Sequence, residues 1–137
     1  MKIAEILDTM EYGPAPESPA AAQAWLDDHD RDFGLFIDNE WVKPEERATM
    51  PAISPATGAE VAQVSIAGKS EVDAAVDAAR AAHKEWAKTS DHQRARHLYA
   101  IARGIQKHHR LLAVLESLDN GKPIRESRDL DVPLVAR

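Results

Sequence analysis

Imidazole side chains bind transition metals, and the chain of 137 residues has six of them: His29, His83, His92, His97, His108 and His109. His92 and His97 are five residues apart, so a helix would not stack them on one face as it stacks an i, i+4 pair. His108 and His109 are adjacent and point in different directions, and no HExxH pattern occurs. The spacing therefore predicts packed or solvent-facing histidines rather than a metal site.

Other catalytic groups are equally sparse. The sequence has no cysteine, which excludes a thiolate nucleophile, disulfides and Cys-ligated zinc or iron–sulfur centres. The GxSxG elbow of serine hydrolases and the glycine-rich phosphate-binding patterns are absent. Asp129 and Asp131 are two residues apart, so a helix would point their carboxylates to different sides. The residues by themselves predict no catalytic site.

A basic stretch runs from Arg94 to Arg110, with five Lys or Arg, three His and no acid. Its cations could contact phosphates, or they could form a solvated helix face with salt bridges to acidic neighbours. The second interpretation is favoured, because no aromatic side chains alternate with the cations in a nucleic-acid motif. Residues 1–48 also hold twelve Asp or Glu against four Lys or Arg. We therefore expect no nucleic-acid partner.

The length fits one domain. No apolar run approaches the ~20 residues that a membrane helix needs, so we expect no membrane partner. The first residues carry acids where a signal peptide needs an apolar run, and we expect a cytoplasmic protein.

The local patterns predict short strands followed by long helices. Residues 35–42 are typical of a β-hairpin, with apolar runs at 35–37 and 41–42 joined by a turn of Asp38, Asn39 and Glu40. A strand is expected from Glu60 to Ile66, after a turn at 53–58. Helices are expected from a capping box at 70–73 to about Ala87, and from Ser90 to a stop at Gly121.

Residues 1–32 contain a proline-rich cluster and a charge run, and we interpret them as a leader outside the core. Residues 33–137 then form one α/β region. Few strands are predicted and none after residue 66, which suggests an incomplete sheet.

Several motifs occur in an order that is more specific than any one of them. They are GLFIDNEW at 34–41, ISPATGAEVA at 53–62, EVDAAVDAARAA at 71–82 and LESLDNGKP at 115–123. This series resembles the N-terminal part of the NAD(P)-dependent aldehyde dehydrogenase superfamily over about residues 33–132. Ser54 and His83 depart from it, standing where asparagine and phenylalanine are usual. Residues 11–18 and 24–27 resemble the leader of aldehyde dehydrogenase family 16, some of whose members lack the catalytic cysteine.

The resemblance implies the N-terminal part of a Rossmann-like cofactor-binding domain, truncated here, in an oxidoreductase that converts aldehydes to carboxylic acids with NAD or NADP. In such enzymes a cysteine attacks the carbonyl, and an asparagine side chain and a backbone N–H hold the oxyanion. The cysteine is missing, and in the family order the dinucleotide-binding motifs follow residue 137. No catalytic or cofactor-binding residue is therefore assigned, and the chain alone is expected to be inactive and to bind no dinucleotide. Its expected partner is the rest of the aldehyde dehydrogenase chain, in a protein that forms homo-oligomers.

One pair of site residues is implied by the resemblance. Many members bind a structural cation through a main-chain carbonyl before the NPxTG-like turn and the carboxylate of the LDNGKP motif, which correspond to Ile53 and Asp119. Oxygen ligands suit Na⁺, Mg²⁺ or Ca²⁺. The alternative role for Asp119 is hydrogen bonding at the helix end.

Two other functions remain open. The helices could form a self-standing protein-interaction module, or an aldehyde dehydrogenase-like scaffold without catalysis. Binding of nucleic acid through 94–110 is the third and least favoured alternative. If the chain is part of a dehydrogenase, Val72, Val76, Trp86 and Leu98 should lack packing partners.

Overall fold

The computed structural model describes residues 18–137, so the predicted leader motif at 11–17 lies outside the described residues. Short strands come first: β1 (Asp32–Phe33), β2 (Leu35–Ile37), β3 (Glu40–Val42), β4 (Thr49–Ile53) and β5 (Glu60–Ser65). Helices flank them on both sides in the sequence: α2 (Ala20–Asp27), α3 (Lys69–Trp86), α4 (Asp91–Lys107), α5 (His109–Asn120), α6 (Ile124–Glu126), the π-helical turn η1 (Ser127–Asp131) and α7 (Val132–Val135). None of the helices in this described part is long and apolar enough to cross a bilayer.

Strands β2 and β3 form the predicted hairpin. They are antiparallel, with Phe36 opposite Trp41 and Ile37 opposite Glu40. Asp38 and Asn39 have φ angles of 50° and 65°. A two-residue turn with both φ values positive matches the right-handed twist of the strands, and Asn and Asp tolerate it. The prediction is confirmed, with Glu40 in the second strand rather than in the turn.

A three-stranded sheet has the order β1-β5-β4. β5 confirms the predicted strand, β4 pairs with it antiparallel, and β1 pairs with it in parallel. Pro51 lies within β4, where its missing N–H is tolerated because β4 is an edge strand. The sequence patterns did not predict β1 or β4.

Helix α2 packs into the core, so the interpretation of residues 1–32 as a leader outside the core is wrong for residues 20–27. Leu26 is 3% exposed and clusters with Val61 and Ala62 of β5. The Arg31 guanidinium donates to the Val61 carbonyl at 3.1 Å and to the Gln23 side chain at 2.6 Å. Burial and these hydrogen bonds together fix α2 on the sheet.

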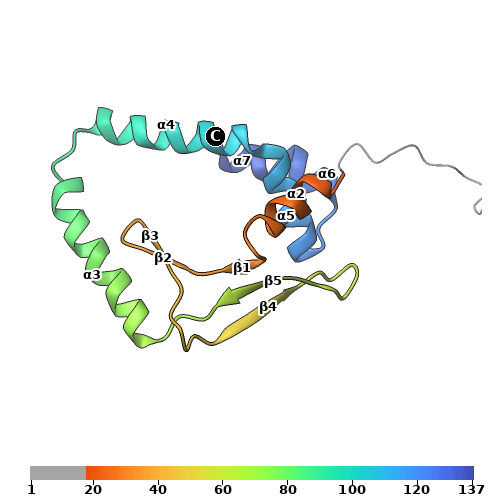
Figure 1. The fold of residues 1–137 in the computed structure, drawn as a ribbon. Coiled ribbons are helices and arrows are strands. Elements are labelled where there is room, and N and C mark those ends of the chain that lie inside the picture. The colour runs from red at the N-terminus through yellow and green to blue at the C-terminus, as the bar shows by residue number, and fades with distance from the viewer. Residues whose placement is uncertain (1–17) are drawn as a thin grey trace, which may run out of the picture.

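Helices α3 and α4 extend away from the sheet and form an open arc beside the β2–β3 hairpin (Figure 1). Neither helix contains a buried residue. The apolar positions that match the helical period are exposed, among them Val72, Val76, Trp86, Leu98 and Ile101. The apolar residues expected to lack packing partners are thus largely exposed, although the Trp86 ring contacts that of His97.

The observed boundaries of the helices agree only in part with those predicted from the sequence. Ser90 caps α4 as predicted, and its hydroxyl accepts from the Gln93 N–H at 3.3 Å. Helix α3 begins earlier than predicted, with Gly68 at the N-cap, because the Glu71 carboxylate accepts from the Gly68 N–H at 2.8 Å. The predicted continuous helix from Ser90 to Gly121 is broken at His108, where φ is −101° and ψ is 17°.

The C-terminal segment folds back on α5. Gly121 ends α5 in the left-handed conformation, with φ of 76°. Lys122 then pairs with Asp131, and the pKa of Lys122 is raised because its ammonium donates to that carboxylate, against an opposing effect of burial. Ser127 is fully buried and accepts from the Ser117 hydroxyl at 3.3 Å. These contacts hold α6, η1 and α7 against α5.

Candidate functional site

The end of α5 lies against the turn that follows β4, and this junction is where the two implied cation ligands belong. A β-carbon placed on Gly121 would lie 2.6 Å from Cγ of Pro55. Ile53 is two residues before Pro55, and Asp119 is two residues before Gly121. The fold therefore brings the segments of both predicted residues to one junction.

The turn itself is well ordered by backbone hydrogen bonds. Ser54 is 4% exposed, its N–H donates to the Ala59 carbonyl at 2.9 Å, and its carbonyl accepts from the Gly58 N–H at 2.8 Å. Gly58 adopts a φ of 71°. This arrangement fixes the direction of the chain immediately after Ile53.

The described residues at the junction offer oxygen atoms, which are suitable ligands for a hard cation, but only a few of them. Asp119 is exposed, and Asn120 uses its side-chain oxygen to accept from the Lys122 N–H at 2.8 Å. Ca²⁺ takes six to eight oxygen ligands, and within residues 18–137 no group of three or more His, Cys, Asp or Glu is placed to hold a metal. The assignment of Ile53 and Asp119 stays a prediction.

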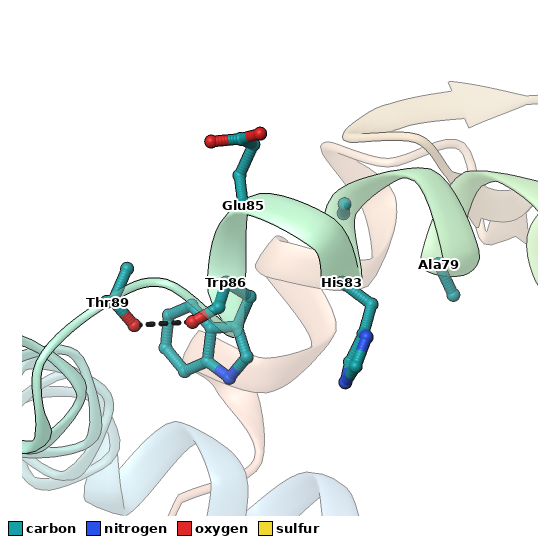
Figure 2. A pocket seen from close by; sticks show the side chains of 6 residues that line it. Ala79, His83, Glu85, Trp86 and Thr89 are labelled. Carbon is teal, nitrogen blue, oxygen red and sulfur yellow. Dashed lines mark hydrogen bonds between the residues drawn. The ribbon is translucent and has the colours of Figure 1, made fainter.

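A wide, open hollow of about 570 Å³ lies at the C-terminal end of α3, lined by Ala79, Ala82, His83, Glu85, Trp86 and Thr89. In Figure 2 the rings of His83 and Trp86 point to the same side of the helix, whereas Glu85 points away from them. The Thr89 hydroxyl donates to the Trp86 carbonyl at 2.6 Å. The hollow contains no nucleophile paired with a base, so its chemistry is that of an apolar contact surface.

Three of the histidines contact a backbone carbonyl or an aromatic ring. His29 Nδ1 lies 2.7 Å from the Trp25 carbonyl oxygen, and His109 Nε2 lies 2.6 Å from that of Arg128. The His97 ring packs against Trp86 with 5.5 Å between centroids. These contacts agree with the prediction of packed or solvent-facing histidines.

Part of the basic stretch is engaged locally. Arg94 donates to the Thr89 carbonyl at 2.6 Å and pairs with Asp91, and Arg103 donates to the Gln106 side chain at 2.8 Å. These contacts favour the interpretation of 94–110 as a solvated helix face.

Sequence patterns missed an ion cluster and an aromatic cluster near α2. Asp32 accepts from both Arg47 and Lys43, and the hydrogen bond from Arg47 is the main reason that its pKa is lowered. The Phe33 ring stacks on those of Trp25 and His29, which are tilted relative to each other. No periodic signal marked either cluster, because α2 ends at Asp27 and Phe33 belongs to β1.

Residues 41–137 match the model of the aldehyde dehydrogenase family. The chain is 44% identical over 99 residues to acetaldehyde dehydrogenase 2 of Cupriavidus necator, covering 72% of this chain and 20% of that protein. It is 42% identical over 102 residues to aldehyde dehydrogenase B of Escherichia coli, and this match covers 74% of this chain and 20% of that protein. The chain belongs to the aldehyde dehydrogenase family, and it spans about a fifth of the length of these relatives.

Solved structures show the same relationship. HpcC from Thermus thermophilus superposes with a TM-score of 0.78 at 31% identity, covering 89% of this chain and 25% of that one. The NAD⁺ complex of aldehyde dehydrogenase from Bacillus cereus superposes with a TM-score of 0.74 at 34% identity. This match covers 90% of this chain and 24% of that one. The predicted α/β fold, with short strands followed by long helices, is confirmed as part of an aldehyde dehydrogenase.

Proposed function

We propose that residues 33–137 act as the N-terminal portion of an aldehyde dehydrogenase cofactor-binding domain, in a protein that oxidises aldehydes to carboxylic acids with NAD⁺ or NADP⁺. Residues 1–32 resemble the N-terminal segment of aldehyde dehydrogenase family 16, and α2 within this segment packs on the sheet. The 137-residue chain alone is inactive, because it has no cysteine to attack a carbonyl and no dinucleotide-binding motif. The absence of that nucleophile, in a chain of this family, is the observation that carries the proposal.

The partner of this chain is the remainder of an aldehyde dehydrogenase, which packs on the apolar side of α3 and α4. Val72, Val76 and Trp86 are 51%, 43% and 42% exposed. Leu98 and Ile101 on α4 are 65% and 60% exposed. Monomers rarely expose so many large apolar side chains on neighbouring elements unless another surface covers them. The assembled protein is a cytoplasmic homo-oligomer.

A structural cation completes the proposed assignment. The main-chain oxygen of Ile53 and the carboxylate of Asp119 would hold Na⁺, Mg²⁺ or Ca²⁺, and further oxygens would come from the partner portion. The contact between Pro55 and Gly121 supports this site, because it joins the two segments. The cation would fix the junction and take no part in oxidation.

The same exposed face favours a second candidate, a non-catalytic module in which α3 and α4 dock a different protein. An experiment with Escherichia coli aldehyde dehydrogenase B distinguishes the dehydrogenase portion from the docking module. A chimera in which residues 33–137 replace the matching fifth of that enzyme should be soluble and should reduce NAD⁺ or NADP⁺ with an aldehyde. The matched control carries Val76→Asp, which places a charge on the covered face.

The two candidate functions, a dehydrogenase portion and a docking module for a different protein, predict different results for the chimera. A dehydrogenase portion predicts activity for the chimera and loss of activity or solubility for its Val76→Asp form. Equal behaviour of the two chimeras would contradict packing of α3 against the rest of the enzyme.

A further inference from the structure

A second cavity, separate from the α3 hollow and from the cation junction, lies between α2 and strands β1 and β3. Its volume is about 320 Å³, within the range of small-ligand clefts. Three aromatic side chains from three elements line it: Trp25 of α2, Phe33 of β1 and Trp41 of β3. None of the functions proposed above uses it.

The aromatic walls are held in place by contacts among themselves. The rings of Trp25 and Phe33 are nearly parallel, with 16° between their planes and 5.5 Å between centroids. His29 packs on Trp25 at 4.3 Å, and its Nδ1 is 2.7 Å from the Trp25 carbonyl oxygen. Trp41 is 67% exposed and completes the lining from the hairpin. Aromatic faces carry negative partial charge and attract cations placed over them.

The charges around the cavity also favour a cation. Asp30 and Asp32 contribute to its lining, together with Lys43. Asp32 already pairs with two cations, Lys43 at 3.2 Å and Arg47, so Asp30 is the carboxylate of the lining that is left for a bound cation. Within the described part of the chain, the Asp30 carboxylate makes no ion pair or hydrogen bond. Residues 18–48 hold eight Asp or Glu against three Lys or Arg.

We propose that this cavity binds a small organic ammonium ion, with the methylated nitrogen over the rings of Trp25, Phe33 and Trp41 and with Asp30 supplying the opposite charge. A tetraalkylammonium group suits the lining because it has no N–H to satisfy and a low desolvation cost. The proposal concerns a site outside the dehydrogenase chemistry and does not rest on the proposed function.

Choline and its neutral isostere 3,3-dimethylbutan-1-ol provide the test, because they share a shape and differ in charge. Each is titrated into the full 137-residue chain while ¹H–¹⁵N NMR and indole fluorescence are recorded, with ionic strength matched by sodium chloride. Choline should give saturable shifts at Trp25, Phe33 and Trp41, and none at Trp86 or Tyr99. The isostere should bind about tenfold more weakly or not at all.

Two variants and one control identify the groups responsible. Trp41→Leu removes an exposed ring, and Asp30→Asn removes the charge while keeping a residue type that tolerates the φ of 54° at this position. Each should weaken choline binding by about threefold to tenfold. Tyr99→Leu, which removes a 68% exposed ring on α4, should leave binding unchanged. Equal binding of choline and the isostere, or no saturable shift at the three aromatic residues, would overturn the proposal.

Discussion

Pro55 and Gly121 are in contact across the junction between the turn after β4 and the end of α5, so closely that a β-carbon on Gly121 would lie 2.6 Å from Cγ of Pro55. Gly121 also has a φ of 76°, which disfavours any other residue except Asn or Asp. Conformation and space therefore both require glycine at this helix end.

Gly121→Ala should destabilise the chain by about 1–3 kcal/mol, because alanine at positive φ is strained and its methyl group would collide with Pro55. Urea unfolding followed by circular dichroism measures the change. The matched control is Gly104→Ala in α4, where an added Cβ meets nothing within 4 Å. That change should stabilise the helix by about 0.5–1 kcal/mol. Equal effects of the two substitutions would refute the account of the junction.

Leu26→Ala should cost about 2–4 kcal/mol of unfolding free energy, because Leu26 is 3% exposed and packs on Val61 and Ala62. The control, Leu98→Ala, alters a side chain that is 65% exposed and should shift stability by less than about 0.5 kcal/mol. Both values come from the same denaturant titration. A Leu26→Ala effect as small as that of Leu98→Ala would mean that α2 is not part of the core.

Stability should fall in acid partly because of Asp32. Hydrogen bonds from Arg47 and Lys43 lower its pKa below the ordinary 3.8, although burial acts in the opposite direction. The contribution of a carboxylate with a lowered pKa is complete above the ordinary pKa and is lost as the pH falls through the lowered value. Asp32→Asn should therefore reduce stability at pH 7 and flatten its decline below about pH 4.

Thermal unfolding between pH 7 and pH 3 measures this effect. Asp38→Asn in the exposed hairpin turn is the control, since no ion pair involving Asp38 is found among the described residues. Parallel pH profiles for the original chain and Asp32→Asn would contradict the prediction.

Asp119→Asn should reduce the response of the chimera with Escherichia coli aldehyde dehydrogenase B to added cations. A carboxylate ligand replaced by a neutral amide binds Ca²⁺ or Mg²⁺ more weakly, so the rise in melting temperature on adding the ion should shrink. Glu116→Gln, one turn earlier on α5, tests for a general effect of charge. If the two variants respond alike, Asp119 serves the helix end rather than a cation.

Features determined by adjacent residues were predictable from the sequence. The turn of the β2–β3 hairpin follows from Asp38 and Asn39, which tolerate positive φ. The Ser90 cap and the Gly121 stop are equally local. In contrast, the predicted start of α3 was wrong. Gly68 rather than Ser70 is the N-cap because the Glu71 carboxylate accepts a hydrogen bond from the Gly68 N–H.

Features that depend on distant pairing were not predictable. Strand β1 has two residues and forms only by pairing in parallel with β5, some thirty residues later. Leu26 shows its burial only when β5 is present, because α2 is short and apolar at six of its eight positions, so no polar side marks the buried face. The aromatic cavity needs Trp41 from the hairpin beside Trp25 of α2, and no local pattern links them. That the chain has no cysteine could be read from the sequence without any fold.

The central claim is that this chain is an inactive portion of an aldehyde dehydrogenase. The most direct test measures reduction of NAD⁺ with acetaldehyde as substrate. The purified 137-residue chain is assayed alongside the chimera with Escherichia coli aldehyde dehydrogenase B. The account predicts no NADH from the chain alone at any enzyme concentration, and aldehyde-dependent NADH from the chimera. NADH formation that rises in proportion to the concentration of the 137-residue chain alone would contradict it.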